Sequence, residues 1–108
     1  MKSMSYAALA LAGSFAISAQ VHAESTPGLA LAKQENCMSC HSVTRPFMGP
    51  ALHDVAAKYA GRSDAEAYLA HKIIDGSTGV WGQVPMPANT QLTPDQAATL
   101  AGWIMTLK

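Results

Sequence analysis

Apolar residues recur with the period of an α-helix in four stretches of the chain, and no stretch shows convincing strand alternation. The last stretch is the clearest, because its apolar residues would lie on one face of a helix. These residues are Ala97, Leu100, Ala101, Ile104 and Met105. The pattern predicts an all-α fold of about four helices.

Capping signals mark where the first two helices begin and end. Thr26 followed by Pro27 suits an N-cap and a first helical position, so a helix is expected from here towards Asn36. A second, short helix is expected over residues 51–59, ended by Gly61.

Similar signals mark the third and fourth helices. Ser63 and Glu66 have the spacing of a capping box, in which each side chain satisfies a free backbone N–H group of the other residue. The third helix is therefore expected to begin there and to stop at Asp75-Gly76. The fourth is expected to open at Thr93-Pro94.

The segment between the third and fourth helices, residues 76–91, is long and irregular. Loops of this length in compact domains are usually functional or disordered. This one contains Val80, Trp81, Val84 and Met86, which make it too apolar for a disordered segment. We expect the loop to pack onto another part of the molecule.

Residues 1–23 have the layout of a cleaved secretory signal peptide. An early cation at Lys2 precedes an apolar stretch over residues 6–17, and Val21-His22-Ala23 offers a small-residue cleavage site. The stretch is too short for a transmembrane span, which needs about 20 apolar residues; retention as an anchor is the alternative. We therefore expect one secreted domain over residues 24–108, located in the periplasm.

A domain of this size has a marginal core unless a disulfide, a metal or a cofactor adds to it. The chain has only two cysteines, and a disulfide across so short a loop would stabilise little. The composition therefore favours a large apolar cofactor. Seven basic and seven acidic side chains give a formal net charge of zero with no basic stripe, which argues against a nucleic-acid partner.

The strongest chemical signal is the run Cys37-Met38-Ser39-Cys40-His41. Cys-x-x-Cys-His is the attachment sequence of a c-type haem, in which two thiols bind the haem vinyl groups and the histidine is an axial iron ligand. A thioredoxin-like redox pair would have a strand before it, whereas a helix is expected here. A structural zinc site would need further ligands, and the chain has no other cysteine.

The second axial ligand decides whether the iron is closed to small molecules. Met86 is the best candidate, because the flanking prolines Pro85 and Pro87 would hold its sulfur in one orientation, far along the chain from His41. The other candidates fit less well, being tied too close to His41 or placed on helices: Met38, Met48, Met105, His53 and His71.

Residues 24–108 resemble the class I cytochromes c, and most of all the small bacterial cytochromes of the c-551 type, because their motifs follow one another in the same order. The matching segments are 36–41 (NCMSCH), 48–51 (MGPA), 54–61 (DVAAKYAG), 76–82 (GSTGVWG) and 84–89 (VPMPAN). The resemblance implies a small all-α fold wrapped round one covalently attached haem c, with His41 and Met86 as its axial ligands.

The resemblance also implies roles for four residues around the haem. The Pro50 carbonyl would accept a hydrogen bond from the His41 ring, Trp81 and Lys72 would bind a haem propionate, and Asn89 would bind the Met86 sulfur. Lys72 stands where this type often has arginine, and residues 42–47 also depart from the pattern. A haem cage and helix contacts are expected from Phe47, Leu52, Val55, Tyr59, Leu69, Ile73, Leu100, Trp103 and Ile104.

These features predict a soluble, monomeric carrier of single electrons in a respiratory chain, and no enzymatic activity. The resemblance suggests a nitrite reductase, a terminal oxidase or a cytochrome c peroxidase as partner. Docking would use the apolar surface around Met38, Val43, Met48 and Pro87. The alternatives are a haem enzyme or gas-binding protein with a displaceable sixth ligand, and a fixed subunit of a redox complex.

Overall fold

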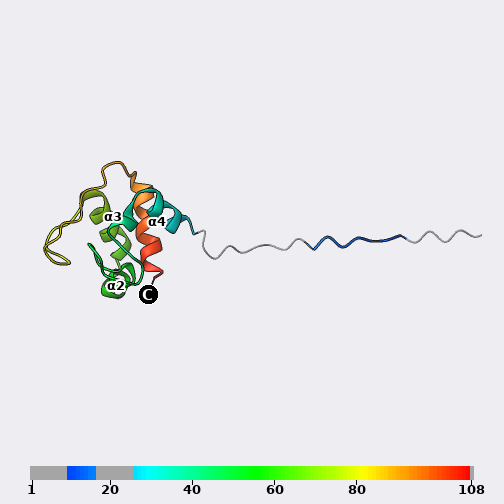
Figure 1. The fold of residues 1–108 in the computed structure, drawn as a ribbon, viewed down its shortest axis with the longest axis horizontal. Helices are drawn as coiled ribbons and strands as arrows, with labels where there is room; N and C mark the ends of the chain where they lie inside the picture. Colours follow the sequence, from blue (N-terminus) through cyan, green and yellow to red (C-terminus); the bar gives the residue numbers. More distant parts are fainter. Residues whose placement is uncertain (1–9, 17–25, 108) are drawn as a thin grey trace, which may run out of the picture.

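The computed structural model describes residues 10–16 and 26–107. Its helices are α1 (Pro27–Gln34), the short 3-10 helix η1 (Cys37–Ser39), α2 (Leu52–Tyr59), α3 (Ala65–Asp75) and α4 (Pro94–Met105). Within those ranges the extended structure amounts to one isolated antiparallel bridge between Ser77 and Met86. The predicted all-α fold with four main helices is thus confirmed (Figure 1).

Most of the predicted signal peptide, including the Val21-His22-Ala23 cleavage site, lies outside the described residues. Residues 10–16 form no helix, and Leu11 and Phe15 are exposed there. Among the helices of the described ranges, none has the length and apolar character needed to cross a membrane. The domain boundary at residues 23 and 24 therefore stays a prediction.

Side-chain caps fix the N-termini of the first and last helices as predicted. Thr26 accepts a hydrogen bond from the backbone N–H of Leu29 at the start of α1. At α4 the Thr93 side chain accepts from the backbone N–H of Gln96, and the Gln96 side chain accepts from the N–H of Thr93. Each cap satisfies backbone donors that have no partner inside the helix.

The predicted capping box at the start of the third helix was wrong. The N-cap of α3 is Asp64, not Ser63, and it makes no side-chain cap hydrogen bond. Its carboxylate instead pairs with the guanidinium of Arg62, which donates through both Nε and an Nη atom. This bidentate pair competes for the capping carboxylate, because an arginine fork binds a carboxylate more strongly than a single backbone N–H does.

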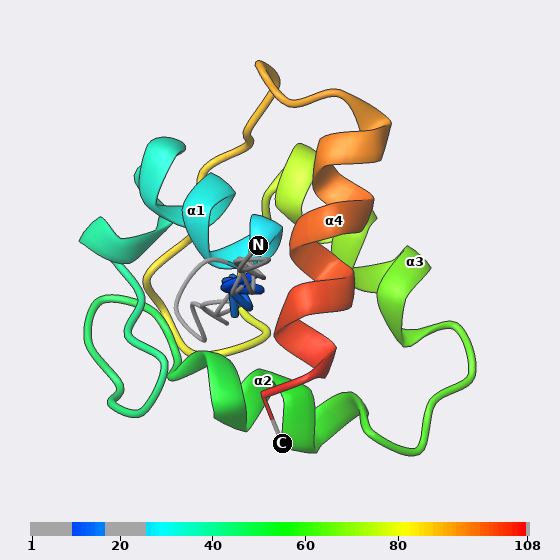
Figure 2. The ribbon, with the colours of Figure 1, turned by 90° about the vertical axis from the view of Figure 1, so that its right-hand side faces the viewer.

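Helix α4 is the element that joins the others. It packs against α1, α2 and α3, and Figure 2 shows these three helices arranged around it. The core forms where its apolar face meets theirs, at Leu52, Val55, Leu69, Leu100 and Ile104. Burial of the predicted apolar stripe of α4 thus organises the whole domain.

The loop after α3 runs away from the helices and returns to α4, as the yellow and orange segment of Figure 1 shows. It begins at Gly76, whose φ of 76° lies in the left-handed region. A Cβ there would also stand 2.6 Å from the Met86 carbonyl oxygen, so the close approach of the two loop arms requires glycine. The arms are joined at the bridge, with Ser77 N–H to Met86 O at 3.0 Å and Met86 N–H to Ser77 O at 2.9 Å.

Candidate functional site

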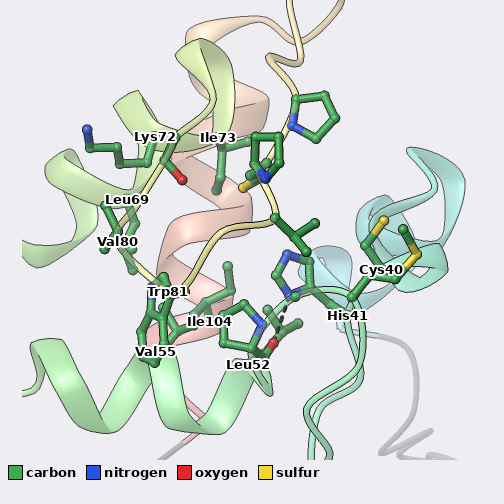
Figure 3. Close-up of a pocket in the computed structure, with 18 of the residues that line it drawn as sticks. Cys40, His41, Leu52, Val55, Leu69, Lys72, Ile73, Val80, Trp81 and Ile104 are labelled. Carbon is green, nitrogen blue, oxygen red and sulfur yellow. Dashed lines mark hydrogen bonds between the residues drawn. The ribbon is translucent and has the colours of Figure 1, made fainter.

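One large apolar cavity lies between the loop of residues 76–91 and the helices. Its walls surround about 1040 Å³ of empty space, part of which is open to solvent. Three parts of the chain form its wall: the loop that begins at Cys40, the helices, and the loop of residues 76–91. In Figure 3 Cys40 and His41 lie on one side of the view, and Leu69, Lys72 and Trp81 on the other.

His41 is held in a fixed orientation at this wall. Its Nδ1 lies 2.8 Å from the carbonyl oxygen of Pro50, drawn as a dashed line in Figure 3. Since a carbonyl can only accept, this bond places a proton on Nδ1, so that Nε2 is the nitrogen available as a ligand when the ring is neutral. The ring packs directly on Gly49, where a Cβ would stand 2.6 Å from His41 Cε1.

Cys37 and Cys40 flank the turn that precedes His41. Both side chains are half-buried and form no disulfide, and the turn is closed by hydrogen bonds from the N–H groups of Cys40 and His41 to the carbonyl of Cys37. Burial, as the largest cause, raises the pKa of the Cys37 thiol above its usual range. Both thiols are therefore on one short helical turn beside the cavity wall.

Met86 lines the same cavity as His41, although 45 positions separate them in the sequence. The Ser77 bridge holds its backbone, and Asn89 holds the segment that follows. The Asn89 side-chain amide donates to the Ile73 carbonyl at 2.9 Å and more weakly to that of Pro87 at 3.4 Å. Its assignment to the Met86 sulfur stays a prediction.

Aromatic and cationic side chains gather at the far end of the cavity. Trp81 is partly exposed, with the ammonium of Lys58 4.5 Å from its ring centroid. The rings of Tyr59 and Tyr68 lie 5.2 Å apart, and the guanidinium of Arg62 stands 4.0 Å above Tyr68. Lys72 lines the cavity, with its ammonium 5.5 Å from the Tyr68 ring centroid, and is therefore the charge that can bind an anionic group at this end.

The buried phenol of Tyr59 makes stability depend on alkaline pH. Burial first, and then Tyr68, raise the pKa of Tyr59 above its usual value of 10.0. The folded state therefore holds this proton more tightly than the unfolded state, so the stabilisation is complete below pH 10 and is lost as pH rises through the folded pKa. We expect the free energy of unfolding to fall more steeply above pH 10 in the wild type than in Tyr59→Phe. Denaturant titrations across this range measure it, and equal slopes would contradict the assignment.

Comparison with known proteins agrees with this geometry. A sequence model described as cytochrome c matches residues 25–108. The chain belongs to the cytochrome c family. It is 56% identical over 78 residues to cytochrome c-552 of Nitrosomonas europaea, covering 72% of this chain and 76% of that protein. It is also 44% identical to cytochrome c-551 of Stutzerimonas stutzeri over the full length of both chains.

Solved structures place this cytochrome among the small class I members. The crystal structure of wild-type Nitrosomonas europaea cytochrome c552 superposes with a TM-score of 0.72, covering 73% of this chain and 98% of that one. The Class 1 cytochrome MtoD from Sideroxydans lithotrophicus ES-1 superposes with a TM-score of 0.62 at 31% identity, covering 74% and 91%. The predicted family, its fold and its single covalently attached haem c are thus confirmed, and the protein is a small electron-carrier cytochrome.

The residues present fit a haem. Apolar side chains line most of the cavity, the His41 imidazole is oriented by its bond to Pro50, and Gly49 leaves the space that this ring fills. A haem needs these three things: a dry wall, a nitrogen ligand, and room for the ligand against the backbone. Within the described ranges, no cluster of three or more His, Cys, Asp or Glu side chains could hold a separate metal ion.

The expected haem cage was mostly right, with one clear error. Leu52, Val55, Tyr59, Leu69, Ile73 and Ile104 line the cavity. Phe47 was wrongly predicted to be among them: it is 68% exposed. The reason is local, because its N–H bonds to the Gly49 carbonyl and closes a tight turn that points the side chain to solvent.

Tyr68 is a cavity residue that the sequence reasoning missed. The available signal was its helical spacing, because Tyr68 stands four residues before Lys72 and so shares a helix face with it. Leu100 and Trp103, by contrast, belong to the packing between helices rather than to the cavity wall.

Proposed function

We propose that this cytochrome is a one-electron carrier of the periplasm, with Cys37 and Cys40 holding the haem through thioether bonds and His41 and Met86 as its axial ligands. The observation that carries the proposal is that His41, oriented by Pro50, lines the same apolar cavity as Met86. When bound, haem supplies an iron that takes up and gives up one electron. A carrier needs both axial positions filled, because a vacant position would admit small ligands.

The cavity walls favour the reduced state. Leu52, Val55, Leu69 and Ile73 are buried and exclude water. A dry environment disfavours the extra positive charge of the oxidised site, and a thioether ligand does the same. The hydrogen bond from His41 to Pro50 keeps the ring in one orientation, so that little has to move when the charge changes.

The far end of the cavity supplies binding groups for the haem propionates. We assign this role to Trp81 and Lys72, both of which line the cavity. A lysine offers a point charge where an arginine would offer a bidentate fork, so Lys72 fixes a carboxylate less rigidly. Asn89 has a different role, which is to bind the Met86 sulfur; its side chain lies next to the Met86 segment, where it also contacts the Pro87 carbonyl.

The exposed apolar side chains suit short-lived docking to a redox partner. Phe47 and Met48 are 68% and 55% exposed on the loop that follows His41, and Val84 is 60% exposed on the long loop. An apolar patch of this kind supports weak, transient complexes. A nitrite reductase, a terminal oxidase or a cytochrome c peroxidase would be a suitable respiratory partner for the monomer, and residues 1–23 would direct export.

Two measurements on the purified holo-protein test the proposed function. A potentiometric titration should follow a one-electron Nernst curve, and the reduced protein should take up carbon monoxide only slowly at neutral pH, because Met86 must first leave the iron. A sixth position open to exchange would instead take up carbon monoxide at once. That result would favour the gas-binding or enzymatic alternative and contradict the carrier role.

Gly49→Ala tests the seating of His41. The added Cβ would stand 2.6 Å from Cε1 and 2.9 Å from Nδ1 of the ring, so the ring must leave its bond to Pro50. We expect a loss of about 1–3 kcal/mol in the free energy of unfolding, as in other overpacked sites. A ring without this bond is also a weaker ligand. Acid titration followed at the Soret band should show His41 displaced at a higher pH than in the wild type, and an unchanged titration would contradict the role of Gly49.

A further inference from the structure

A path of side-chain hydrogen bonds joins the two segments that carry the proposed axial ligands. It begins at Glu35, two residues before Cys37, and ends beside Met86. The central contact is from Gln91 Nε2 to Glu35 Oε2 at 3.2 Å, which spans 56 positions of sequence. The path therefore connects the attachment turn directly to the long loop, outside the cavity itself.

Gln91 uses both hydrogens of its amide in this path. The second contact of Nε2 is to Asn89 Oδ1 at 3.3 Å. An amide nitrogen has two N–H groups and no acceptor, so one group serves Glu35 and the other serves Asn89. Gln91 itself is exposed, whereas Glu35 and Asn89 are half-buried.

The contact from Gln91 is one of three that fix which way the Asn89 amide points. Because Asn89 Oδ1 accepts from Gln91, its Nδ2 is directed at the carbonyls of Ile73 and Pro87. The reversed amide would place oxygen against two carbonyl oxygens, and nitrogen against another amide nitrogen. Three neighbours thus agree on one orientation, in which the N–H groups of Asn89 face the Pro87 side, next to Met86.

Asn89 also fastens the loop to α3 through its backbone. Its N–H donates to the Ile74 carbonyl at 3.0 Å and to the Ile73 carbonyl at 3.3 Å. Loss of the Gln91 contact would therefore leave this backbone attachment in place. It would remove one of the three contacts that orient the Asn89 amide, together with the link to Glu35.

We propose that Glu35 and Gln91 are positioning residues for Met86, acting through Asn89, and this rests on the proposed role of Met86 as an axial ligand. The two residues hold the long loop against the attachment turn and fix the Asn89 amide that faces the Met86 segment. Each opening of the loop must then break these contacts as well as the bond to the ligand. The path consequently slows the departure of Met86 without contributing to the haem cavity.

Replacement of Gln91 tests this in the holo-protein. The rate of carbon monoxide uptake by the reduced protein measures how often Met86 leaves, and it should rise about three-fold to ten-fold in Gln91→Ala, as expected for the loss of one or two hydrogen bonds. Glu35→Ala should behave in the same way. Glu35→Gln should restore the wild-type rate, because an amide oxygen also accepts a hydrogen bond.

Gln83→Ala is the matched control, since Gln83 is an exposed glutamine of the same loop. It should leave the rate unchanged. Global unfolding of Gln91→Ala in guanidinium, followed by far-UV circular dichroism, should shift its midpoint only slightly, so that global unfolding does not account for the faster uptake.

Three results would overturn the inference: a wild-type rate in Gln91→Ala, a Glu35→Gln protein as fast as Glu35→Ala, or a rate that merely follows the global unfolding midpoint. Rapid uptake by the wild type itself would be a different failure. It would contradict Met86 as a ligand, and the proposed function would fall together with this inference.

Discussion

Met86→Ala is expected to abolish the weak absorption band of the methionine–iron bond, near the red end of the visible range, in the oxidised protein. The reduction potential should fall at the same time, because a thioether favours the reduced state. Axial ligands set haem potentials over a range of roughly 0.8 V, so we expect a decrease on the order of a few hundred millivolts. The reduced variant should bind carbon monoxide readily, since its sixth position is no longer filled by the protein.

Met48→Ala is the control for this prediction. Met48 lines the same cavity, but it is 55% exposed and follows His41 by only seven residues. Its removal should keep both the band and the resistance to carbon monoxide. If the band survives in Met86→Ala and disappears in Met48→Ala, the ligand assignment is wrong, while the fold and the haem attachment would stand.

Gly28→Ala is expected to cause the largest loss of stability among simple substitutions in the helices. Gly28 is buried in α1, where that helix crosses α4. An added Cβ would overlap the Cβ and Cγ atoms of Trp103, which lie close to the α4 backbone and cannot rotate away. The two helices would have to separate, so we expect a loss of about 3 kcal/mol, at the upper end for overpacked cores. Guanidinium unfolding followed by far-UV circular dichroism measures it.

Gly61→Ala is the matched control, because a Cβ at Gly61 would meet no atom within 4 Å. The same chemical change should there be neutral or stabilising by about 0.4–1 kcal/mol, since alanine restricts the unfolded chain. Equal stabilities of the two variants would show that the close crossing of α1 and α4 does not depend on glycine.

The helices could be predicted from the sequence because their signals are local. Each of these signals acts over only a few residues. The caps at Thr26 and Thr93 and the apolar stripe of α4 are present in the structure as predicted. The error at Ser63 is also informative. The spacing was that of a capping box, yet the N-cap is Asp64, and its carboxylate pairs with Arg62 instead of capping the helix. Neighbouring residues can thus offer alternative helix caps, and the sequence pattern alone does not show which cap forms.

The site was predictable only where a motif or a family pattern reaches across the sequence. The motif at residues 37–41 indicated haem, and the resemblance supplied the contact between His41 and Pro50, which the structure contains. The outward turn at Phe47 and the contact between Glu35 and Gln91 had no such signal. Each depends on how separate segments meet in space, and no spacing in the chain records that.

The arrangement of contacts around α4 has a consequence for how the protein is made. Helices α1, α2 and α3 pack mainly against α4 and little against one another. Residues 94–105 are synthesised after all of them, so the earlier helices lack their main partner until α4 has emerged. A chain that stops before residue 94 would therefore lack the packing partner of α1, α2 and α3 alike, so the core cannot form in part and the domain should fold as one unit.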